Sequence, residues 1–251
     1  MLKKTINNNF KKLTDNLNSL IENFNSEGTL YIKGSRNTIR LFKLHNQTLN
    51  IKSFKKPALL NSFIYRYFRK SKARRSYEYA TILLEKGVGT PTPIAYYENQ
   101  NLISLQESYY VSEHQLYDLT FRELVQQLEY QDHENILRQF TRFTWKMHEA
   151  GILFKDHSPG NTLIKKDGAN YLFFLVDLNR MKFIQLTFKD RIKNFSRLTP
   201  KKEMIEIMSD EYAKLIQQPY EKIFDAMWYE TERFQEKYWR KQRFKQKCLG
   251  R

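Results

Sequence analysis

Length, composition and charge exclude several classes of protein. The chain has 251 residues, 41% of them hydrophobic, which is enough for one large domain or two small lobes with a core. No apolar run reaches bilayer-spanning length, and Met1–Leu20 lacks the apolar core of a secretory signal. The single cysteine, Cys248, cannot form an internal disulfide, so we expect a cytoplasmic protein in a reducing compartment.

The charge of the chain is strongly unbalanced. Lys and Arg number 43 against 27 Asp and Glu, which gives a formal net charge of +16 at pH 7. An excess of this size favours an anionic partner, such as nucleic acid, an acidic membrane surface or a phosphorylated substrate. Charge alone does not decide among these three.

The N-terminal half predicts a helix, a small sheet and a second helical region. Apolar residues at helical spacing predict a helix over Asn16–Phe24, and residues 61–86 are predicted to be helical in two pieces. Short apolar segments separated by turn-like residues predict strands, the first three of them in an antiparallel meander. The predicted strands are 30–32, 38–42, 48–52, 93–97 and 102–111.

The C-terminal half predicts two helices, a hairpin and a helical end. Helical patterns cover residues 121–128 and 134–149. Apolar strands at 162–164 and 171–176 flank a turn-rich segment, which is typical of a hairpin. After Phe183 the chain is predicted to be helical and becomes increasingly basic.

This order of elements predicts an α+β fold with two segregated lobes. We expect an N-terminal helical extension over residues 1–27, an N-lobe over 28–115 and a C-lobe over 116–251. The N-lobe holds the predicted sheet and one long helix, and the C-lobe holds the hairpin, the other helices and the basic end.

Three polar residues after position 150 form the candidate chemical site. Asp156 and Asn161 stand five positions apart in one loop, and Asp177 follows the second hairpin strand. Phosphoryl transfer needs an acidic residue near the acceptor hydroxyl and oxygen ligands for Mg²⁺. A loop ending in Asn and a hairpin ending in Asp can supply both ligands. The spacing alone also fits a turn with local side-chain caps, but the order of helix, loop, hairpin and Asp177 raises its specificity.

These residues resemble the lipopolysaccharide kinase family, the Kdo and heptose kinases, which are small relatives of protein kinases. The resemblance rests on residues 148–161, on Val-Asp-Leu-Asn-Arg at 176–180, and on the run 190–198. It covers about residues 28–215. It implies a small two-lobed, protein-kinase-like fold with an antiparallel-sheet N-lobe, a mainly helical C-lobe, and ATP and Mg²⁺ as cofactors.

The resemblance also implies the nucleotide-binding pair. Residues 49–54 are similar to the lysine strand of such kinases, so Lys52 is expected to hold ATP phosphates. Lys56 has the same strand parity and is the alternative if the strand continues. The segment 71–78 is similar to the helix that supplies the lysine's partner, which would be Glu78. For each of these residues a solvated surface charge is the competing interpretation.

The turn that would cover the phosphates departs from the usual pattern. It contains Gly34 as its single glycine, so Ser35, with Arg36 and Asn37, is expected to meet the phosphates. Phe154-Lys155 takes the place of the His-Arg pair before the catalytic Asp, and Asn179 stands where protein kinases have Gly. No Ala-Pro-Glu sequence is present. These departures argue against a regulated protein kinase and leave the catalytic set intact.

The histidines do not predict a metal site. His157 adjoins Asp156, and we interpret it as a structural loop residue, with substrate binding as the alternative. His133 and His148 lie far apart without a cysteine cluster, so zinc is not expected.

Two basic segments with interleaved aromatics could meet an anionic partner. Residues 65–75 are one, and Lys237–Arg251, with seven basic residues and no acidic ones, is the other. Both fit nucleic acid and both fit anionic lipid. A helix with a buried aromatic face is the alternative for 65–75. For the C-terminal segment the alternative is that Tyr238, Trp239 and Phe244 are core residues. We favour a membrane surface over nucleic acid.

The sequence therefore predicts an ATP- and Mg²⁺-dependent kinase for a sugar hydroxyl on a lipopolysaccharide core or another lipid-linked glycan. Asp156 would accept the acceptor proton, and Asn161 and Asp177 would bind Mg²⁺. The sugar acceptor follows from the resemblance alone, whereas a peripheral place on the inner face of the cell membrane is expected from the basic C-terminal segment Lys237–Arg251. The alternatives are a kinase for a small-molecule or protein acceptor and a non-catalytic pseudokinase that binds RNA or membrane.

Overall fold

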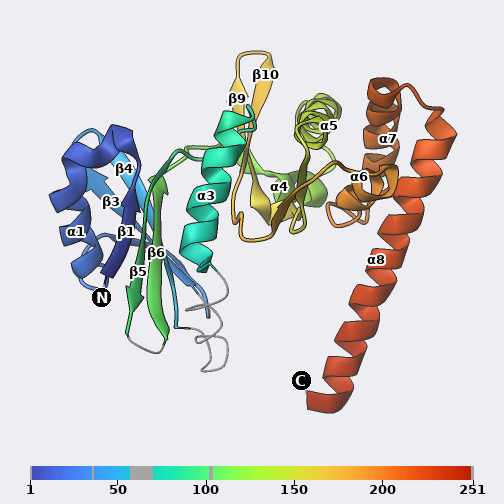
Figure 1. Ribbon diagram of the computed structural model, residues 1–251. Coiled ribbons are helices and arrows are strands. Elements are labelled where there is room, and N and C mark those ends of the chain that lie inside the picture. The colour runs from blue at the N-terminus through green and yellow to red at the C-terminus, as the bar shows by residue number, and fades with distance from the viewer. Residues whose placement is uncertain (1, 36, 57–69, 102–103, 250–251) are drawn as a thin grey trace. The chain divides into compact units, whose positions relative to one another are not determined.

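The computed structural model describes residues 2–35, 37–56, 70–101 and 104–249, and the chain divides into two compact units, Met1–Leu116 and Tyr117–Arg251. The elements of unit 1 (Figure 1) are β1 (Leu2–Ile6), η1 (Asn8–Leu13), α1 (Thr14–Glu22), β2 (Thr29–Lys33), β3 (Asn37–Leu44), β4 (Gln47–Phe54), α3 (Lys72–Glu85), β5 (Pro93–Gln100) and β6 (Leu105–Glu113). The elements of unit 2 are β7 (Leu119–Thr120), α4 (Phe121–Gln126), α5 (His133–Glu149), β8 (Ile152–Phe154), η2 (Pro159–Asn161), β9 (Thr162–Asp167), β10 (Asn170–Leu175), β11 (Met181–Phe183), α6 (Phe188–Phe195), α7 (Lys202–Ile216) and α8 (Tyr220–Leu249). Arg36, the first piece of the predicted helix over 61–86, the aromatic part of the basic segment 65–75, and the start of the predicted strand 102–111 lie outside the described residues.

Unit 1 is built on an antiparallel sheet with the strand order β1-β5-β6-β4-β3-β2. The predicted meander is confirmed, because β2, β3 and β4 are neighbours in sequence and in the sheet. The helical extension predicted over residues 1–27 instead begins with a strand, which pairs with β5 from Leu2 opposite Asn99 to Ile6 opposite Ala95. The sequence of β1 has no regular alternation, so its pairing with β5 decides its conformation.

Alternation along the strands sorts the side chains onto two faces of this sheet. Tyr97 and Tyr109 are cross-strand partners on the face that α1 covers, and the next pair, Tyr96 and Tyr110, lies on the face that α3 covers (Figure 1). The core on the α1 side consists of Leu17, Ile21, Phe24, Phe42, Leu49, Ile51, Ile94, Ala95, Tyr97, Tyr109 and Val111. The smaller cluster on the α3 side consists of Phe54, Ala73 and Tyr96, with Tyr77 and Tyr110 packed against it.

Unit 2 is mainly helical and has one apolar core. Helix α5 packs against α7, β8 and β10, and α8 packs against α6 and α7. The predicted hairpin is confirmed as β9 and β10, with Asn170 opposite Asp167 and Gly168 at a φ of +60° in the turn. The core is formed by Leu119, Phe121, Leu124, Ile136, Leu137, Phe140, Ile164, Tyr171, Phe173, Ile192, Phe195, Leu198, Met204, Ile205, Met208, Tyr212, Ala213, Ile223 and Met227.

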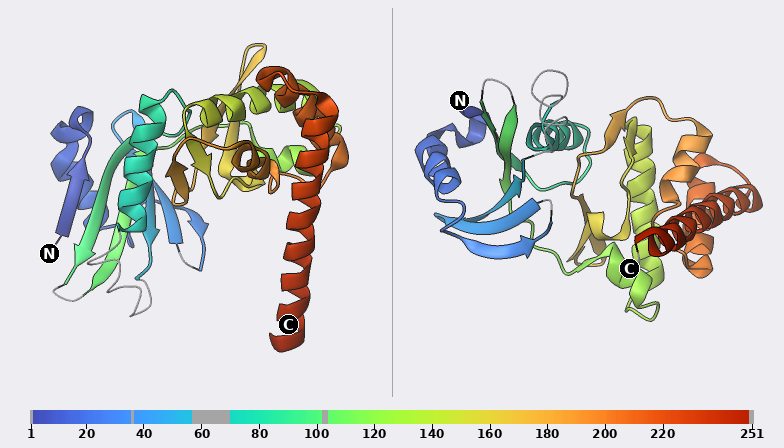
Figure 2. Two further views of the ribbon diagram at one scale, coloured as in Figure 1. Left: turned by 45° about the vertical axis from the view of Figure 1, so that its right-hand side comes forward. Right: turned by 90° about the horizontal axis from the view of Figure 1, so that it is seen from below.

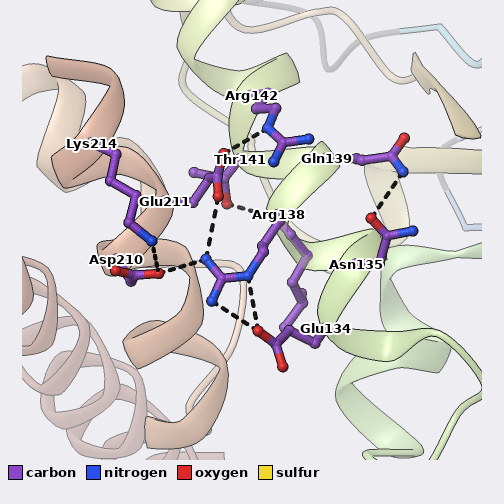
Figure 3. Close-up of polar contacts among 10 residues, drawn as sticks. Glu134, Asn135, Arg138, Gln139, Thr141, Arg142, Asp210, Glu211 and Lys214 are labelled. Carbon is purple, nitrogen blue, oxygen red and sulfur yellow. Dashed lines mark hydrogen bonds and ion pairs between the residues drawn. The ribbon is translucent and has the colours of Figure 1, made fainter.

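A network of ion pairs joins α5 to α7 (Figure 3). Arg138 of α5 contacts Asp210 at 2.6 Å and Glu134 at 2.8 Å, and Arg142 contacts Glu211 at 2.6 Å. Glu211 is only 9% exposed, so its charge needs these partners. The network fixes α5, the helix that leads into β8 and the Asp156 loop.

Helix α8 has a packed first part and an exposed last part. Ile223 and Met227 are in the core, whereas Tyr238, Trp239 and Phe244 are 44%, 56% and 67% exposed. The interpretation of these three aromatics as core residues is therefore wrong. Figures 1 and 2 show the last part of α8 extending past the helices on which its first part packs. Within the described ranges, no helix combines the length and apolarity that crossing a bilayer requires.

Candidate active site

The candidate site in unit 2 is built on two backbone segments that run side by side. Strand β8 leads into Asp156, and β11 follows the Asp177 motif. The two strands pair antiparallel, and the N–H of Lys155 donates to the carbonyl of Arg180 at 2.8 Å. The loop that carries the predicted base and the segment that carries the predicted metal ligand are therefore neighbours.

The backbone before and at Asp156 is held by side chains. Three consecutive carbonyls each accept a hydrogen bond from a different side chain. These bonds run from Asn194 Nδ2 to Phe154 O (2.7 Å), from Arg197 Nη1 to Lys155 O (3.0 Å) and from Asn161 Nδ2 to Asp156 O (2.8 Å). Because β8 is only three residues long, these side chains supply the anchoring that a longer ladder would give.

Asn161 connects the Asp156 loop to the Asp177 segment. Its side chain donates to Asp156, and its carbonyl accepts from the N–H of Val176 at 3.0 Å. Val176 immediately precedes Asp177. The structure thus brings the segments of all three candidate residues together around Asn161.

Asp177 has an unusual backbone conformation. Its φ is +57°, in the left-handed region, which costs a non-glycine residue on the order of 1 kcal/mol. Asn179 stabilises this turn, because its backbone N–H donates to the Asp177 carbonyl at 2.9 Å and its Nδ2 donates to Asp177 Oδ1 at 2.8 Å. The side chain of Asp177 is exposed. Such local strain is often retained at functional sites.

The donor set of Asn161 and Asp177 fits Mg²⁺. The Asn161 amide nitrogen is used in its bond to Asp156, so the amide oxygen is the atom left for a cation. One amide oxygen and one carboxylate are hard ligands, and Mg²⁺ commonly takes one or two such protein ligands and completes its shell with waters and phosphate oxygens. Among the described residues no cluster of three or more His, Cys, Asp or Glu could hold a metal by itself.

Arg197 is a neighbour of Asp156 to which the sequence assigned no role. Its Nη1 lies 2.9 Å from Asp156 Oδ1, and the two side chains are 34% and 24% exposed. Its guanidinium carbon lies 5.5 Å from the centre of the Phe234 ring of α8. Arg197 lies in the run 190–198 that carries part of the resemblance, but nothing in that run indicated a contact with Asp156.

A buried chain of polar side chains supports the same backbone. Asn194 donates to Phe154 through Nδ2, so its Oδ1 must accept from His148 Nε2 at 3.0 Å. Burial lowers the pKa of His148 to about 4, so the imidazole is neutral and its Nδ1 accepts from Tyr212 Oη at 2.9 Å. Burial raises the pKa of Tyr212 to about 12, which keeps this donor protonated. The chain therefore has one arrangement of protons, and this arrangement fixes Asn194 against β8.

His157 is buried next to the loop and is not a surface residue. It is 1% exposed, with its ring centre 5.5 Å from that of Phe140 and 5.7 Å from that of Phe154. Neither ring nitrogen has a hydrogen-bond partner among the described residues. Burial lowers the pKa of His157 to about 3. This environment supports the structural interpretation of the residue over direct substrate binding.

In unit 1, Lys52 lies on the sheet face that carries α3. It follows the buried Ile51 and pairs with Tyr110, and its ammonium is 5.3 Å from the centre of the Phe54 ring. Strand β4 ends at Phe54, so Lys56 lies beyond the strand and loses the parity that made it the alternative.

Glu78 on α3 is held by two basic residues. Its carboxylate accepts from Lys70 at 2.7 Å and from Arg74 at 2.8 Å. Burial alone would raise the pKa of Glu78, but these hydrogen bonds outweigh it and lower the pKa. Glu78 is therefore ionised at neutral pH, and its pairing with Lys52 stays a prediction.

The turn between β2 and β3 contains Gly34 and Ser35. The N–H of Gly34 donates to the carbonyl of Asn37 at 2.9 Å, and a Cβ at Gly34 would lie 2.8 Å from Asn37 Oδ1. A larger residue at this position would therefore displace the Asn37 side chain. Ser35 is exposed, and its contact with phosphates stays a prediction.

Comparison with known proteins gives a family and a fold. The model of the lipopolysaccharide kinase (Kdo/WaaP) family matches residues 15–219. No curated protein matches the chain significantly. A solved complex of WaaP with acyl carrier protein has a TM-score of 0.66 at 18% identity, covering 94% of this chain and 98% of that one. A co-crystal of WbdD with the kinase inhibitor LY294002 has a TM-score of 0.46 at 16% identity, covering 80% and 44%. The match to WaaP confirms the predicted α+β, kinase-like fold.

The two buried histidines predict a loss of stability in mild acid. Unfolded histidine binds a proton near pH 6.5, whereas in the folded state the pKa values of His148 and His157 are about 4 and about 3. The unfolded state therefore binds more protons below pH 6.5, and the free energy of unfolding should fall by about 3 kcal/mol per histidine between pH 6.5 and 4. Urea unfolding across this range measures the fall.

Substitution of His157 by Leu separates this effect from other acid effects. His157→Leu should change the free energy of unfolding at pH 7.5 by less than about 1 kcal/mol, because the ring nitrogens make no hydrogen bond of normal geometry and only a weak contact with Asn194 is lost. Below pH 6.5 the free energy of unfolding of the variant should fall less steeply than that of the parent protein, by about 1.4 kcal/mol per pH unit. His45→Asn, at an exposed turn position, is the matched control and should keep the parent profile. A His157→Leu profile as steep as the parent's would contradict the assignment.

Proposed function

The chain belongs to the lipopolysaccharide kinase (Kdo/WaaP) family, and we propose that it transfers the γ-phosphoryl group of ATP to a sugar hydroxyl of a lipopolysaccharide core or another lipid-linked glycan. The observation that carries this proposal is the position of Asn161, which is bonded to the backbone of Asp156 and of Val176, the residue before Asp177. One loop thus gathers a general base and two oxygen ligands, the set that phosphoryl transfer to an alcohol requires.

Each residue of unit 2 has a defined role in the proposal. Asp156 orients the acceptor hydroxyl and accepts its proton as the oxygen attacks the γ-phosphorus. Asn161 and Asp177 hold Mg²⁺, which neutralises charge on the phosphate oxygens when bound. The rigid backbone around Asp156 keeps the carboxylate in place before the acceptor arrives, so little reorganisation is needed during the reaction.

The residues of unit 1 are proposed to hold the nucleotide. Lys52 would contact the ATP phosphates, and Glu78 would hold that lysine. Gly34 and Ser35 would cover the phosphates, where the turn offers the exposed Ser35 hydroxyl. Lys52 is supported by its place on the α3 face of the sheet, the face that also carries the helix of Glu78.

We further propose a cytoplasmic place for the enzyme, at the inner face of the cell membrane. The support is the last part of α8, where Lys237, Tyr238, Trp239, Arg240 and Lys241 are all exposed. At 100° per residue the basic side chains at positions 237, 240, 241, 243, 245 and 247 fall within an arc of about 200°, so one side of the helix would attract anionic lipid electrostatically.

Loss of the carboxylate at Asp177 should abolish catalysis without loss of the fold. In Asp177→Asn a neutral amide replaces a charged metal ligand, so Mg²⁺-dependent transfer should fall by at least about 100-fold. Labelled ATP and an envelope glycolipid extract measure the transfer, and a thermal melt measures the fold. Asp167→Asn, at the exposed end of β9, is the control and should retain activity. A folded Asp177→Asn enzyme with normal turnover would exclude Asp177 as the metal ligand. A parent protein that turns over no ATP with any acceptor would favour the pseudokinase alternative.

Three neighbouring lysines test the nucleotide site. Lys52→Ala should lower kcat/KM for ATP by about 100-fold, because a phosphate contact is lost. Lys55→Ala and Lys56→Ala should change it less than about twofold, since both side chains are exposed and β4 ends before them. An inactive Lys56→Ala beside an active Lys52→Ala would show that a different lysine holds the phosphates.

Removal of residues 237–251 tests the membrane proposal. No described side chain in this segment is buried, so the truncated protein should fold and should keep its activity on a soluble acceptor. Its binding to anionic vesicles should weaken, mainly at low salt, because the Debye length is about 8 Å at physiological ionic strength. Two matched full-length variants separate charge from aromatic contact: Lys241, Lys245 and Lys247 to Gln, or Tyr238, Trp239 and Phe244 to Ser. Loss of RNA binding in place of vesicle binding would overturn the membrane proposal.

A further inference from the structure

The side chain of Arg197 contacts three residues in two parts of unit 2, the Asp156 loop and α8. Its Nη1 forms an ion pair with Asp156 Oδ1 at 2.9 Å and also donates to the Lys155 carbonyl at 3.0 Å. Its guanidinium group lies near the Phe234 ring, with 5.5 Å between the guanidinium carbon and the ring centre. Its Nε is buried and has no hydrogen-bond partner among the described residues, so the head group is held by these contacts alone.

We propose that Arg197 is the positioning residue for the carboxylate of Asp156, and that Phe234 of α8 holds Arg197 in place. This inference rests on the proposed function, in which Asp156 is the general base. One carboxylate oxygen, Oδ1, is engaged by the arginine, so Oδ2 is the oxygen that meets the acceptor. In the transfer step, the hydroxyl proton passes to Asp156 Oδ2. The hydroxyl oxygen bonds to the γ-phosphorus as the bond between this phosphorus and the departing ADP oxygen breaks.

The hydrogen bond from Arg197 to the Lys155 carbonyl fixes the position of the guanidinium relative to the Asp156 backbone. A carboxylate can rotate about its Cβ–Cγ bond, and an ion pair to one oxygen limits that rotation. The bond to the Lys155 carbonyl ties the guanidinium to the residue that precedes Asp156, so carboxylate and backbone are held by one group. Both polar contacts use Nη1, and the guanidinium also lies near the Phe234 ring, a contact that a compact lysine ammonium on a flexible stem would not reproduce in the same way.

The contact with Phe234 comes from outside the region that the family model covers. The match ends at residue 219, and α8 begins at Tyr220. A guanidinium near an aromatic face is attracted to the ring quadrupole, so Phe234 helps to hold Arg197. Helix α8 therefore contacts Asp156 indirectly, through Arg197, and also packs in the core.

An acceptor-binding role for Arg197 makes a different kinetic prediction. If Arg197 held an anionic group of the acceptor, its loss would raise KM for the acceptor. If it positions Asp156, its loss lowers kcat and leaves both KM values nearly unchanged. A purely structural role would lower the melting temperature and the amount of active enzyme without a specific loss of kcat per folded molecule.

The experiment is a double-mutant cycle between Arg197→Gln and Asp156→Asn in the full chain, with labelled ATP and the best acceptor found. Arg197→Gln should lower kcat by about 10- to 100-fold, the range expected when a group that orients a reactive residue is removed. In the Asp156→Asn background the same substitution should have less than about a twofold further effect, because Arg197 acts through that carboxylate. Arg197→Lys should restore part of the lost kcat.

The aromatic partner is tested in the same assay. Phe234→Leu keeps the apolar volume and removes the ring face, and it should lower kcat by about two- to fivefold, the equivalent of 0.5–1 kcal/mol. Glu232→Gln is the matched control, because it removes an exposed charge two positions away on α8. It should leave kcat unchanged. If Arg197→Gln fails to fold, Arg197→Lys and Phe234→Leu still decide the question.

Two results would overturn the inference while leaving the proposed function intact. One is a normal kcat in Arg197→Gln together with an inactive Asp156→Asn. The other is an additive cycle, in which Arg197→Gln lowers kcat by the same factor in the Asp156→Asn background as in the parent enzyme. A rise in acceptor KM at constant kcat would assign Arg197 to acceptor binding instead. Full activity in Asp156→Asn would reject the base itself, and so the proposed mechanism.

Discussion

Three hydrogen bonds from side chains to the consecutive carbonyls of Phe154, Lys155 and Asp156 are the interaction on which unit 2 depends. Strand β8 is too short to hold the loop by its own ladder. A backbone carbonyl that is shielded from water and lies beyond the end of a strand must find another donor or lose a hydrogen bond. Here the donors come from α6, from the segment after it and from the loop itself, so folding of the helical part is a condition for the geometry of Asp156.

The rest of unit 2 makes this support rigid. Tyr212 donates to His148, and His148 donates to Asn194, which orients the Asn194 side chain. Burial keeps the imidazole neutral, so the three side chains have one pattern of donors and acceptors. The ion pairs between α5 and α7, centred on Arg138 and Glu211, fix the two helices that carry His148 and Tyr212. A buried polar network of this kind is stabilising only when its members are satisfied, and it specifies a single arrangement when they are.

The first part of helix α8 is packed against unit 2, and its last part is exposed. Its first part fills the core with Ile223 and Met227 and places Phe234 against Arg197. Its last part buries no described side chain and carries a dense positive charge. A helix that continues from a packed segment is already nucleated, so its exposed end can stay helical without a core of its own. The same element can therefore support the loop and present charge to a partner.

The sequence by itself determined the order of helices, the β2–β4 meander, the β9–β10 hairpin and the candidates Asp156, Asn161 and Asp177, because periodicity, turn residues and motif order are local. The tertiary structure alone decided that residues 2–6 form a strand and that β8 pairs with β11, because short strands without alternation take their conformation from a partner. It also decided that Lys56 lies beyond β4, that His157 is buried, and that Arg197, one of 43 basic residues, meets Asp156. Ion pairs between distant positions leave no periodic signal in the sequence, and only the packing of helices around a common core brings such side chains into contact.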